Sequence, residues 1–322
     1  MRILITGAGG PSAISVWKSL SADHELHMAD IDPCAAGLYL VPEDRRLIVP
    51  RGDSPELAPA LHAACRARSI ELLLPTVDSE FVPLASARAD FEVLGVALPI
   101  SPLEALEVCR DKNLLINRLR GLAPVPDSEP LTPAVAARVD TFPRFVKPRS
   151  GAGSRGAEKI ASRRELEAQA MDGSLLLQEY LTGEEYSVDV YVHSDGRVMA
   201  AVPRERMKTD SGVAVTARTL RNEELIASAV RIAQVIGIRY VANIQFKRAA
   251  DGVFKLLEIN PRFPGTLPLT TASGIDMPKL MVDDVLGRDM PDGLLPFREI
   301  MVVRYWTEHY CDSTEWEKLC RR

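Results

Sequence analysis

The sequence predicts a mixed α/β protein of more than one domain, with an open parallel sheet at its start. Three observations predict it. Strand and helix signals alternate through the first hundred residues, a glycine-rich turn follows the first strand, and a hairpin rich in polar side chains occupies residues 243–262. Alternating strands and helices are typical of parallel sheets, because a crossover helix joins each strand to the next. The 322 residues are enough for two or three domains with cores of their own.

The first hundred residues carry the signals of a βαβ arrangement. Short apolar runs indicate strands, and apolar side chains spaced three or four residues apart indicate helices. In chain order we expect a strand at Ile3–Thr6, a helix from Pro11 to Leu20, a strand at Glu25–Ala29, a helix at Pro55–Arg68 and a strand at Glu71–Pro75.

A second unit begins at the linker near Leu98–Pro102. Leu103–Arg120 is typical of one helix, and residues 124–143 are rich in proline and polar residues. Further along we expect helices at Arg163–Met171, Glu223–Gly237 and Met277–Gly287, and strands at Leu175–Tyr180, Ser187–His193 and Val198–Pro203. The segment 294–322 indicates a short strand and helix that either complete the core or form a dimer contact.

Composition and charge exclude several classes of protein. The net charge of −5 gives no electrostatic case for nucleic acid as the main partner. No apolar run approaches the roughly 20 residues that span a bilayer, and the N-terminus enters a strand pattern without the features of a signal peptide. The cysteines are scattered without a C-x-x-C pair, so neither a disulfide framework nor a zinc site is expected. We expect a cytoplasmic protein with no membrane partner.

The hairpin at residues 243–262 is the most informative stretch. Asp251-Gly252 is a turn dipeptide between apolar, β-prone flanks. Side chains alternate across a strand, so Glu258 and Asn260 share a face, and Gln245 can face them across the ladder. Arg262 follows two residues later. Hard oxygen ligands beside a guanidinium are what a Mg²⁺–polyphosphate site requires.

A lysine and a glycine-rich loop lie about a hundred residues upstream of that hairpin. Lys147 ends an apolar strand, and the loop from Gly151 to Gly156 follows it. Backbone amides of such a loop can close over phosphates while the lysine supplies charge. The spacing does not fit the G-x-x-x-x-G-K-[ST] phosphate loop, and taken alone the segment is more often a surface hairpin.

The turn Gly7-Ala-Gly-Gly10 follows the first strand and precedes a helix. It can present amides to an anion at the helix N-terminus. Ser12 stands where the dinucleotide fingerprint has its third glycine, and Asp30 and Asp32 lie near the place of a ribose-binding acid. The signal for a nicotinamide cofactor is weak, and the alternative is a tight βα turn with a substrate carboxylate or phosphate nearby.

Residues 178–189 form a strand, a turn and a second strand. Backbone groups from Glu179 to Leu181 could contact the edge of a purine, and Glu185 could accept hydrogen bonds from ribose hydroxyls. On this segment alone, a charged turn between strands is the better interpretation.

Arg204, Arg206 and Lys208 form a basic run that we assign to a loop containing Gly212. These cations could neutralise a γ-phosphate or an acyl phosphate. A solvated basic loop is the competing interpretation.

Asp78 and Glu80 follow a buried strand of the predicted sheet. Ligands bind at the carboxyl ends of parallel strands in open α/β sheets. A helix N-cap formed by Asp78 or Ser79 is the alternative, and the residue types favour it.

In this order, the motifs resemble the ATP-grasp superfamily, and most closely its branch similar to the synthetase domains of the carbamoyl phosphate synthetase large subunit. The match runs over residues 1–290, and Gln245 with Glu258–Arg262 is its most specific part. The resemblance implies that Gln245, Glu258 and Asn260 hold one or two Mg²⁺ ions, with Mn²⁺ as a substitute, that bridge the phosphates of ATP. It implies that Arg262 contacts phosphate or an acyl phosphate.

The resemblance also implies the rest of the site. It assigns Lys112 and Lys147 to ATP phosphates, and Lys147, Arg206 and Arg262 to catalysis. The remaining ATP-binding residues would be Gly151, Gly153, Ser154 and Gly156 in a mobile lid, Glu179, Tyr180 and Leu181 beside the adenine, Glu185 on the ribose, and Gln245 and Glu258 through the metal. The acid substrate would lie near Asp78, Glu80, Arg262 and Gly265.

The resemblance further implies a domain order. Residues 1–102 would form a Rossmann-like domain that precedes the ATP-grasp fold and helps to bind substrate rather than NAD. Residues 103–182 would form the small lobe with a central linker helix, residues 183–292 the large lobe with the Mg²⁺–ATP site, and residues 293–322 a C-terminal extension.

The expected reaction is ligation of a small-molecule carboxylate to an amine. The chain has one synthetase-like unit, no glutaminase domain and no biotin-carrier segment, which is typical of stand-alone ligases that activate the carboxylate as an acyl phosphate and release ADP and phosphate. A homodimer is common among such proteins. The alternatives are a bicarbonate- or carbamate-activating enzyme, a non-catalytic ATP-binding module and, least favoured, an NAD-linked dehydrogenase.

Overall fold

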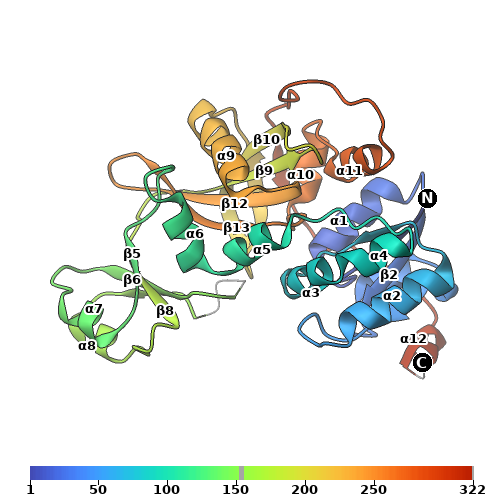
Figure 1. Cartoon of the computed structure of the whole chain (residues 1–322), viewed down its shortest axis with the longest axis horizontal. Helices are drawn as coiled ribbons and strands as arrows, with labels where there is room; N and C mark the ends of the chain where they lie inside the picture. The colour runs from blue at the N-terminus through green and yellow to red at the C-terminus, as the bar shows by residue number, and fades with distance from the viewer. Residues whose placement is uncertain (152–155, 321–322) are drawn as a thin grey trace.

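The structure is a computed structural model of the chain, and it describes residues 1–151 and 156–320. Three β-sheets organise these residues (Figure 1). The first unit is blue in that view, a small sheet in green extends away from it, and a larger sheet in yellow and orange lies beside both. No helix of the described part of the chain is long and apolar enough to cross a membrane.

The first sheet is parallel and has the strand order β3-β2-β1-β4. Its strands are β1 (Arg2–Thr6), β2 (Glu25–Asp30), β3 (Arg46–Ile48) and β4 (Leu72–Leu74). Helices α1 (Pro11–Leu20), α2 (Leu57–Arg68), α3 (Phe81–Ser86) and α4 (Arg88–Val93) surround it. Ile3 and Ile5 pack into one core, whereas Leu4 packs into another on the opposite face. This alternation explains why Ile3, Leu4 and Ile5 are apolar in succession, because helices cover both faces.

The small sheet is antiparallel and has the order β5-β8-β6-β7. It consists of β5 (Ser128–Pro130), β6 (Arg144–Pro148), β7 (Glu158–Ile160) and β8 (Leu175–Glu179), with helices α7 (Pro133–Ala137) and α8 (Arg163–Glu167). Helix α8 is shorter than the stretch Arg163–Met171 that the sequence predicts. Val146 and Leu177 are at the centre of a core of its own.

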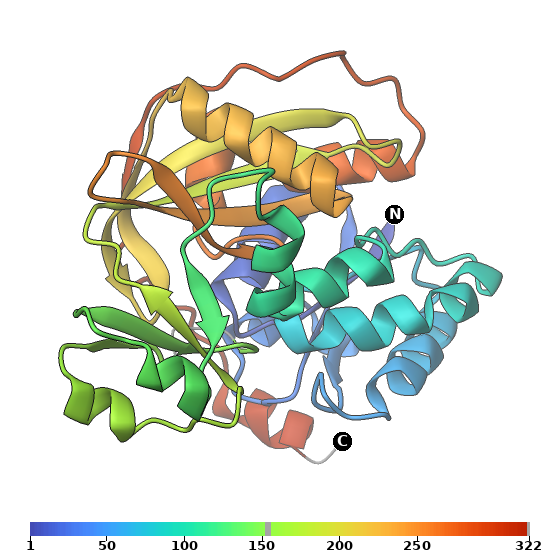
Figure 2. The same cartoon turned by 60° about the vertical axis from the view of Figure 1, so that its left-hand side comes forward.

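The large sheet has the order β13-β12-β9-β10-β11-β14 and is antiparallel throughout. Its strands are β9 (Glu185–Val192), β10 (Val198–Asp210), β11 (Val213–Thr219), β12 (Tyr240–Arg248), β13 (Phe254–Asn260) and β14 (Met301–Val303). Helix α9 (Glu223–Ile236) lies across one face (Figure 2) and buries Leu225, Ala229 and Ile232 against it. The other face keeps the polar side chains of the candidate site.

The helix that the sequence predicts over Leu103–Arg120 is two helices, α5 (Leu103–Arg110) and α6 (Lys112–Leu119). Asp111 separates them in an extended conformation, and its carboxylate accepts hydrogen bonds from the amides of Asn113 and Leu114. The apolar period continues through the break, which hides this N-cap in the sequence. As a result Lys112 begins α6, and its amide donates to the carbonyl of Arg149.

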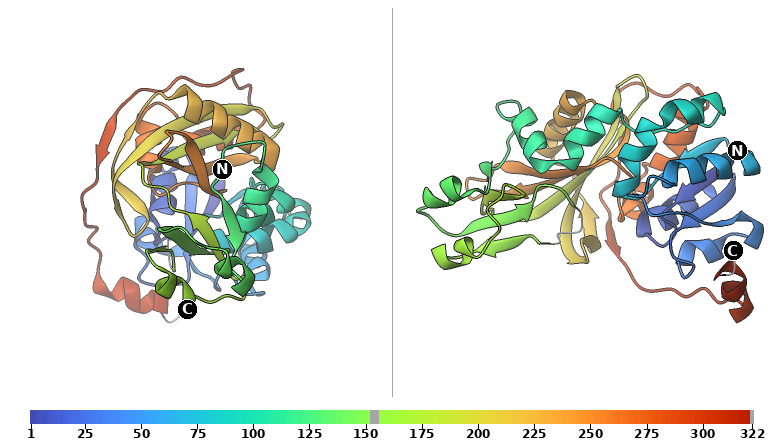
Figure 3. Two further views of the ribbon diagram at one scale, coloured as in Figure 1. Left: turned by 90° about the vertical axis from the view of Figure 1, so that its left-hand side faces the viewer. Right: turned by 60° about the horizontal axis from the view of Figure 1, so that its bottom comes forward.

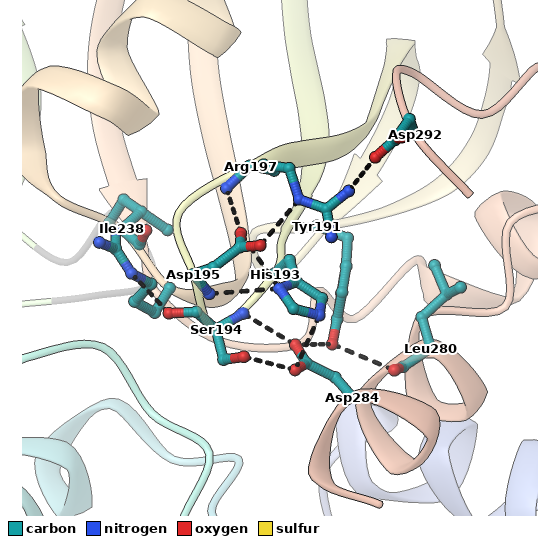
Figure 4. Close-up of polar contacts among 10 residues, drawn as sticks. Tyr191, His193, Ser194, Asp195, Arg197, Ile238, Leu280, Asp284 and Asp292 are labelled. Atoms are coloured by element: carbon teal, nitrogen blue, oxygen red, sulfur yellow. Dashed lines mark hydrogen bonds and ion pairs between the residues drawn. The ribbon is translucent and has the colours of Figure 1, made fainter. Parts of the chain in front are cut away.

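Helix α11 (Met277–Val285) joins the first unit to the large sheet. Residues at the end of β9 and in the turn that follows bind this helix through Asp284 (Figure 4). The buried carboxylate of Asp284 accepts hydrogen bonds from the Tyr191 hydroxyl (3.0 Å) and from the amide (2.9 Å) and hydroxyl (2.6 Å) of Ser194. His193 lies 3.3 Å from the same carboxylate. On its other side α11 packs on α1, where Ser19 donates to Asp276.

The C-terminal segment contacts both the large sheet and the first unit. Strand β14 pairs with β11, and α12 (Ser313–Cys320) packs on the first unit, where Glu315 pairs with Arg46 at 2.7 Å. Between them the chain crosses from the large sheet to the first unit (Figure 3). The prediction of a strand and a helix in residues 294–322 is therefore confirmed.

Candidate active site

A cleft between the small sheet and the large sheet brings together charged residues from five segments of the chain. The charged side chains are those of Lys112 from α6, Lys147 from β6, Glu185 from β9, Arg206 from β10 and Glu258 from β13. The complete lining is Lys112, Phe145, Lys147, Pro148, Ser150, Gly151, Ala157, Glu185, Arg206, Gln245, Leu257 and Glu258. Three cations against two carboxylates make this cleft suitable for an anionic ligand.

Two lysines lie on one side of the cleft and are largely buried. Lys147 is 7% exposed and donates to the carbonyl of Leu257 at 3.1 Å. Burial lowers the pKa of Lys147 to about 8; Glu258 nearby opposes this shift and Lys112 adds to it. Lys112 donates to the carbonyl of Gly151 at 2.9 Å and lies 3.7 Å from the Glu258 carboxylate. Both ammonium groups therefore converge on the strand that carries Glu258.

The predicted hairpin is present, and Gln245 faces Glu258 as expected, since the two pair directly across β12 and β13. The side-chain amide of Asn260 donates to the Glu258 carboxylate at 3.2 Å, and the side-chain amide of Gln245 donates to the side-chain oxygen of Asn243 at the same distance. Among the described residues no group of three or more His, Cys, Asp or Glu side chains could hold a metal. One carboxylate and two amide oxygens fit Mg²⁺ only when ligand phosphates complete its coordination.

The prediction that Arg204, Arg206 and Lys208 lie in a loop is wrong. Strand β10 extends to Asp210 and carries all three residues. Arg204 is 1% exposed and forms a two-point ion pair with Asp189 at 2.7 and 2.8 Å, so it supports the sheet from within. Lys208 is exposed on the distal part of β10. Only Arg206 reaches the cleft.

Arg206 is a buried cation with incomplete hydrogen bonding. One nitrogen donates to the carbonyl of Gly212 at 3.0 Å, whereas its buried Nε has no hydrogen-bond partner among the described residues. The Glu185 carboxylate lies 3.7 Å away and is closer to Lys247, at 3.1 Å. Burial lowers the pKa of Arg206. A buried guanidinium with a free donor favours an additional anion.

The residues expected beside an adenine lie where β8 leads to β9, in the connection between the small and large sheets. Glu179 holds Lys255 at 2.5 Å and accepts from the amide of Asp127. The Tyr180 ring lies under the ammonium of Lys159, and Leu181 is buried. Of the predicted lid, Gly151 and Gly156 adopt positive φ, whereas Gly153 and Ser154 lie outside the described residues.

The guanidinium of Arg262 is bound to the first unit, while its backbone amide donates to the carbonyl of Asn260 at 2.8 Å. Its guanidinium makes a two-point ion pair with Asp78 at 2.7 and 2.9 Å. The N-cap interpretation of Asp78 or Ser79 is wrong, because Val77 occupies the cap position of the short 3-10 turn Asp78–Glu80. The ion pair between Asp78 and Arg262 instead links the first unit to the segment that follows β13 of the large sheet.

Glu80 faces the interior of the first unit. It is 4% exposed, its carboxylate accepts from the Thr6 hydroxyl at 2.5 Å, and burial raises its pKa to about 7. This geometry does not direct Glu80 toward a substrate. Gly265 lies at the junction of the units, where an added Cβ would come 3.1 Å from Pro11 and 3.2 Å from Val213.

Models of known protein families match two parts of this chain. Residues 172–309 match a family model described as "ATP-grasp in the biosynthetic pathway with Ter operon", and residues 3–99 match the PylC-like N-terminal domain. Residues 172–309 therefore belong to the ATP-grasp superfamily.

Solved structures support the same fold. A biotin carboxylase complex from Campylobacter jejuni is 19% identical with a TM-score of 0.72, over 90% of this chain and 72% of that one. An N5-carboxyaminoimidazole ribonucleotide synthetase from Thermotoga maritima is 17% identical with a TM-score of 0.69, over 92% and 78%. An L-amino acid ligase from Bacillus licheniformis is 16% identical with a TM-score of 0.66, over 88% and 74%. The resemblance to carbamoyl phosphate synthetase in particular stays a prediction.

The glycine turn of this ATP-grasp protein is tightly packed against its own unit. Gly7 has a φ of +67°, and a Cβ there would come within 2.5 Å of Val77. The amide of Gly9 donates to one oxygen of Asp30 and the amide of Asp32 to the other. Because the backbone already occupies both oxygens, the geometry favours the tight βα turn over a ribose-binding acid.

Two residues of the site were not identified from the sequence, although a signal existed for each. Phe145 lines the cleft two residues before Lys147 on β6. Asn243 lies two residues before Gln245 on β12, and it donates to Asp189 at 2.7 Å. The two-residue period of a strand places each on the same face as its predicted neighbour. The carbonyl of Leu257, which accepts from Lys147, carries no sequence signal.

Proposed function

We propose that this ATP-grasp protein is a ligase that activates a carboxylate with ATP and transfers it to an amine, giving an amide, ADP and phosphate. The observation that carries the proposal is the convergence of Lys112, Lys147 and Arg206 on a cleft that also presents Gln245 and Glu258. Three cations beside oxygen ligands suit a polyphosphate and its metal. Proteins of the same fold have been solved in complex with beta-gamma-ATP, MgADP or ADP, which supports the same ligands.

The residues would divide the work by position. Gln245, Glu258 and Asn260 would hold Mg²⁺, which would neutralise phosphate charge when bound. Lys147 and Arg206 would stabilise the group in transfer, since both are buried and each has spare donors. Arg262 would hold the acid or its acyl phosphate near the first unit. Most of the catalysis would come from positioning and charge stabilisation, as in other phosphoryl transfers.

An ADP-release assay with a panel of acids and amines tests the proposal. Release that requires both an acid and an amine is expected. Bicarbonate belongs in the panel, because the biotin carboxylase domain of a 2-oxoglutarate carboxylase from Hydrogenobacter thermophilus, which has the same fold, was solved with MgADP and bicarbonate. Release with bicarbonate alone would identify the alternative activity, and tight ATP binding without any release would identify a binding module.

The substitution Glu258→Gln tests the metal assignment. It removes the only formal charge among the three proposed ligands, so turnover should fall by at least a hundredfold. Glu224→Gln, an exposed position in the first turn of α9, is the matched control. Turnover of the Glu258 variant near the parental rate would show that this metal site is wrongly assigned.

A further inference from the structure

The chain segment that follows β14 carries an arginine into the junction between the two units. The amide of Arg304 donates to the carbonyl of Val215 at 2.9 Å and so continues the pairing of β14 with β11. Its guanidinium turns the other way and donates to the carbonyl of Gly265 at 2.8 Å. The next two side chains, Tyr305 and Trp306, are almost fully exposed. Arg304 is therefore the residue of this segment that is directed inward.

The Arg304 guanidinium is half-buried, and no carboxylate in the described part of the chain forms an ion pair with it. The side chain donates to one carbonyl, which leaves donors of a five-donor group available. Burial lowers the pKa of Arg304, and no charged neighbour among the described residues opposes that shift. A guanidinium withdrawn from water without an anion is unfavourable, so the position is suited to an anionic ligand.

The position of Gly265 connects this arginine to the proposed acid site. Gly265 lies three residues after Arg262, and a Cβ added there would come 3.1 Å from Pro11 of the first unit and 3.2 Å from Val213 of β11. Arg262 donates to the carbonyl of Phe263, and Arg304 to that of Gly265. Carbonyls two residues apart are separated by roughly 7 Å of chain at most. The two guanidinium groups therefore flank one short stretch of backbone.

We propose that Arg304 binds a second anionic group of the acid substrate, so that the substrate is an acid with two anionic groups. This inference rests on the proposed ligase function. Arg262 would meet the carboxylate that is activated, and Arg304 would fix the far end of the same molecule. The second group is a carboxylate or a phosphate, because a planar guanidinium pairs with either through two parallel hydrogen bonds.

Kinetics with matched substrates test this assignment. Each dicarboxylic acid is compared with its monoamide, and phosphorylated acids form a separate arm that distinguishes phosphate from carboxylate. In the parent, KM for the preferred two-anion acid should be lower than for its neutralised analogue. Arg304→Gln should raise that KM by on the order of tenfold to a hundredfold, the range for one charge-assisted pair. It should leave kcat and the KM of the neutralised analogue nearly unchanged, and Arg304→Lys should recover part of the loss.

Arg298→Gln is the control variant. Arg298 lies on the same C-terminal segment and also donates to a carbonyl, that of Ala272 at 2.8 Å, but it is exposed at the end of α10 (Leu267–Ala272). A merely structural contribution of Arg304 would make Arg304→Gln less stable without separating the two kinds of acid. Equal effects of Arg304→Gln and Arg298→Gln on KM would overturn the inference.

A binding measurement separates this inference from the proposed function. Thermal shift of the parent and of Arg304→Gln is measured with the same dicarboxylates, phosphorylated acids and monoamides, without ATP. Stabilisation of the parent by a two-anion acid, lost in Arg304→Gln and kept in Arg298→Gln, supports the site even if no acid yields ADP. If no acid of either arm stabilises the parent more than its neutralised analogue does, the second-anion site is wrong. Absence of ADP release with the site intact would instead count against the ligase function.

Discussion

Lys147 gives ATP binding a predictable dependence on pH. Burial holds its pKa at about 8 in the ligand-free protein. Phosphate groups beside the ammonium would raise that pKa again, because an opposite charge favours the charged form. ATP should therefore bind the protonated lysine and compete with its deprotonation.

The magnitude follows from the fraction of protein that carries the proton. With a pKa of about 8, the protonated fraction falls from about nine-tenths at pH 7 to about one-tenth at pH 9. If bound ATP keeps the lysine charged throughout, the Kd should rise about tenfold over this interval, or about 1.4 kcal/mol. At pH 8, binding should take up about half a proton.

Isothermal titration calorimetry measures both quantities. The binding enthalpy is compared in buffers of different ionisation enthalpy to obtain the proton uptake. Lys147→Arg keeps the charge over the whole range, so its affinity should lose this pH dependence, and the difference between the variants removes the titration of ATP itself. A Kd that changes less than twofold between pH 7 and pH 9, together with no proton uptake at pH 8, would refute the reasoning.

Three further predictions concern carboxylates. Asp78→Asn removes the charge that holds Arg262, so kcat should fall about tenfold with ATP affinity unchanged; Asp78→Glu should restore part of it, and an unchanged kcat would disprove the coupling. Asp284→Asn places an amide opposite the donors of Tyr191 and Ser194, and chemical unfolding should show a loss of about 2–3 kcal/mol without an effect on ATP binding. Glu80 has its pKa raised by burial to about 7, so its contribution to stability is complete below its ordinary pKa and should decline by about 3 kcal/mol as the pH rises to 7. Glu80→Gln should remove that decline, and parallel unfolding profiles for the two proteins would contradict it.

The sequence specified the parts of the site that depend on local periodicity. The two-residue alternation placed Glu258 and Asn260 on one face, whereas the pairing of Gln245 with Glu258 also depends on a register shift between Gln245 and Phe246 that the sequence did not indicate. Apolar runs likewise located β1 and α1 to within a residue.

The parts that escaped prediction depend on contacts between distant segments. Nothing near Asp78 indicates that its partner is Arg262, 184 residues later. The basic run looked like a loop because charged side chains usually mean solvent. Instead β10 continues through it, since Asp189 on the neighbouring strand neutralises Arg204 inside the sheet. Pairing across strands can thus place charge where composition predicts exposure.

The anchoring of α11 to both the first unit and the large sheet has a consequence for motion. These two bodies are held together, whereas the small sheet has a separate core, from which Lys147 reaches the Leu257 carbonyl of the large sheet. A swing of the small sheet would return Lys147 to water and restore its ordinary pKa. Closing would then expel a proton between pH 8 and 10.5 unless phosphate is present. At neutral pH, the cost of burying the charged lysine therefore disfavours closing of the empty cleft. The phosphates of a bound nucleotide would offset that cost.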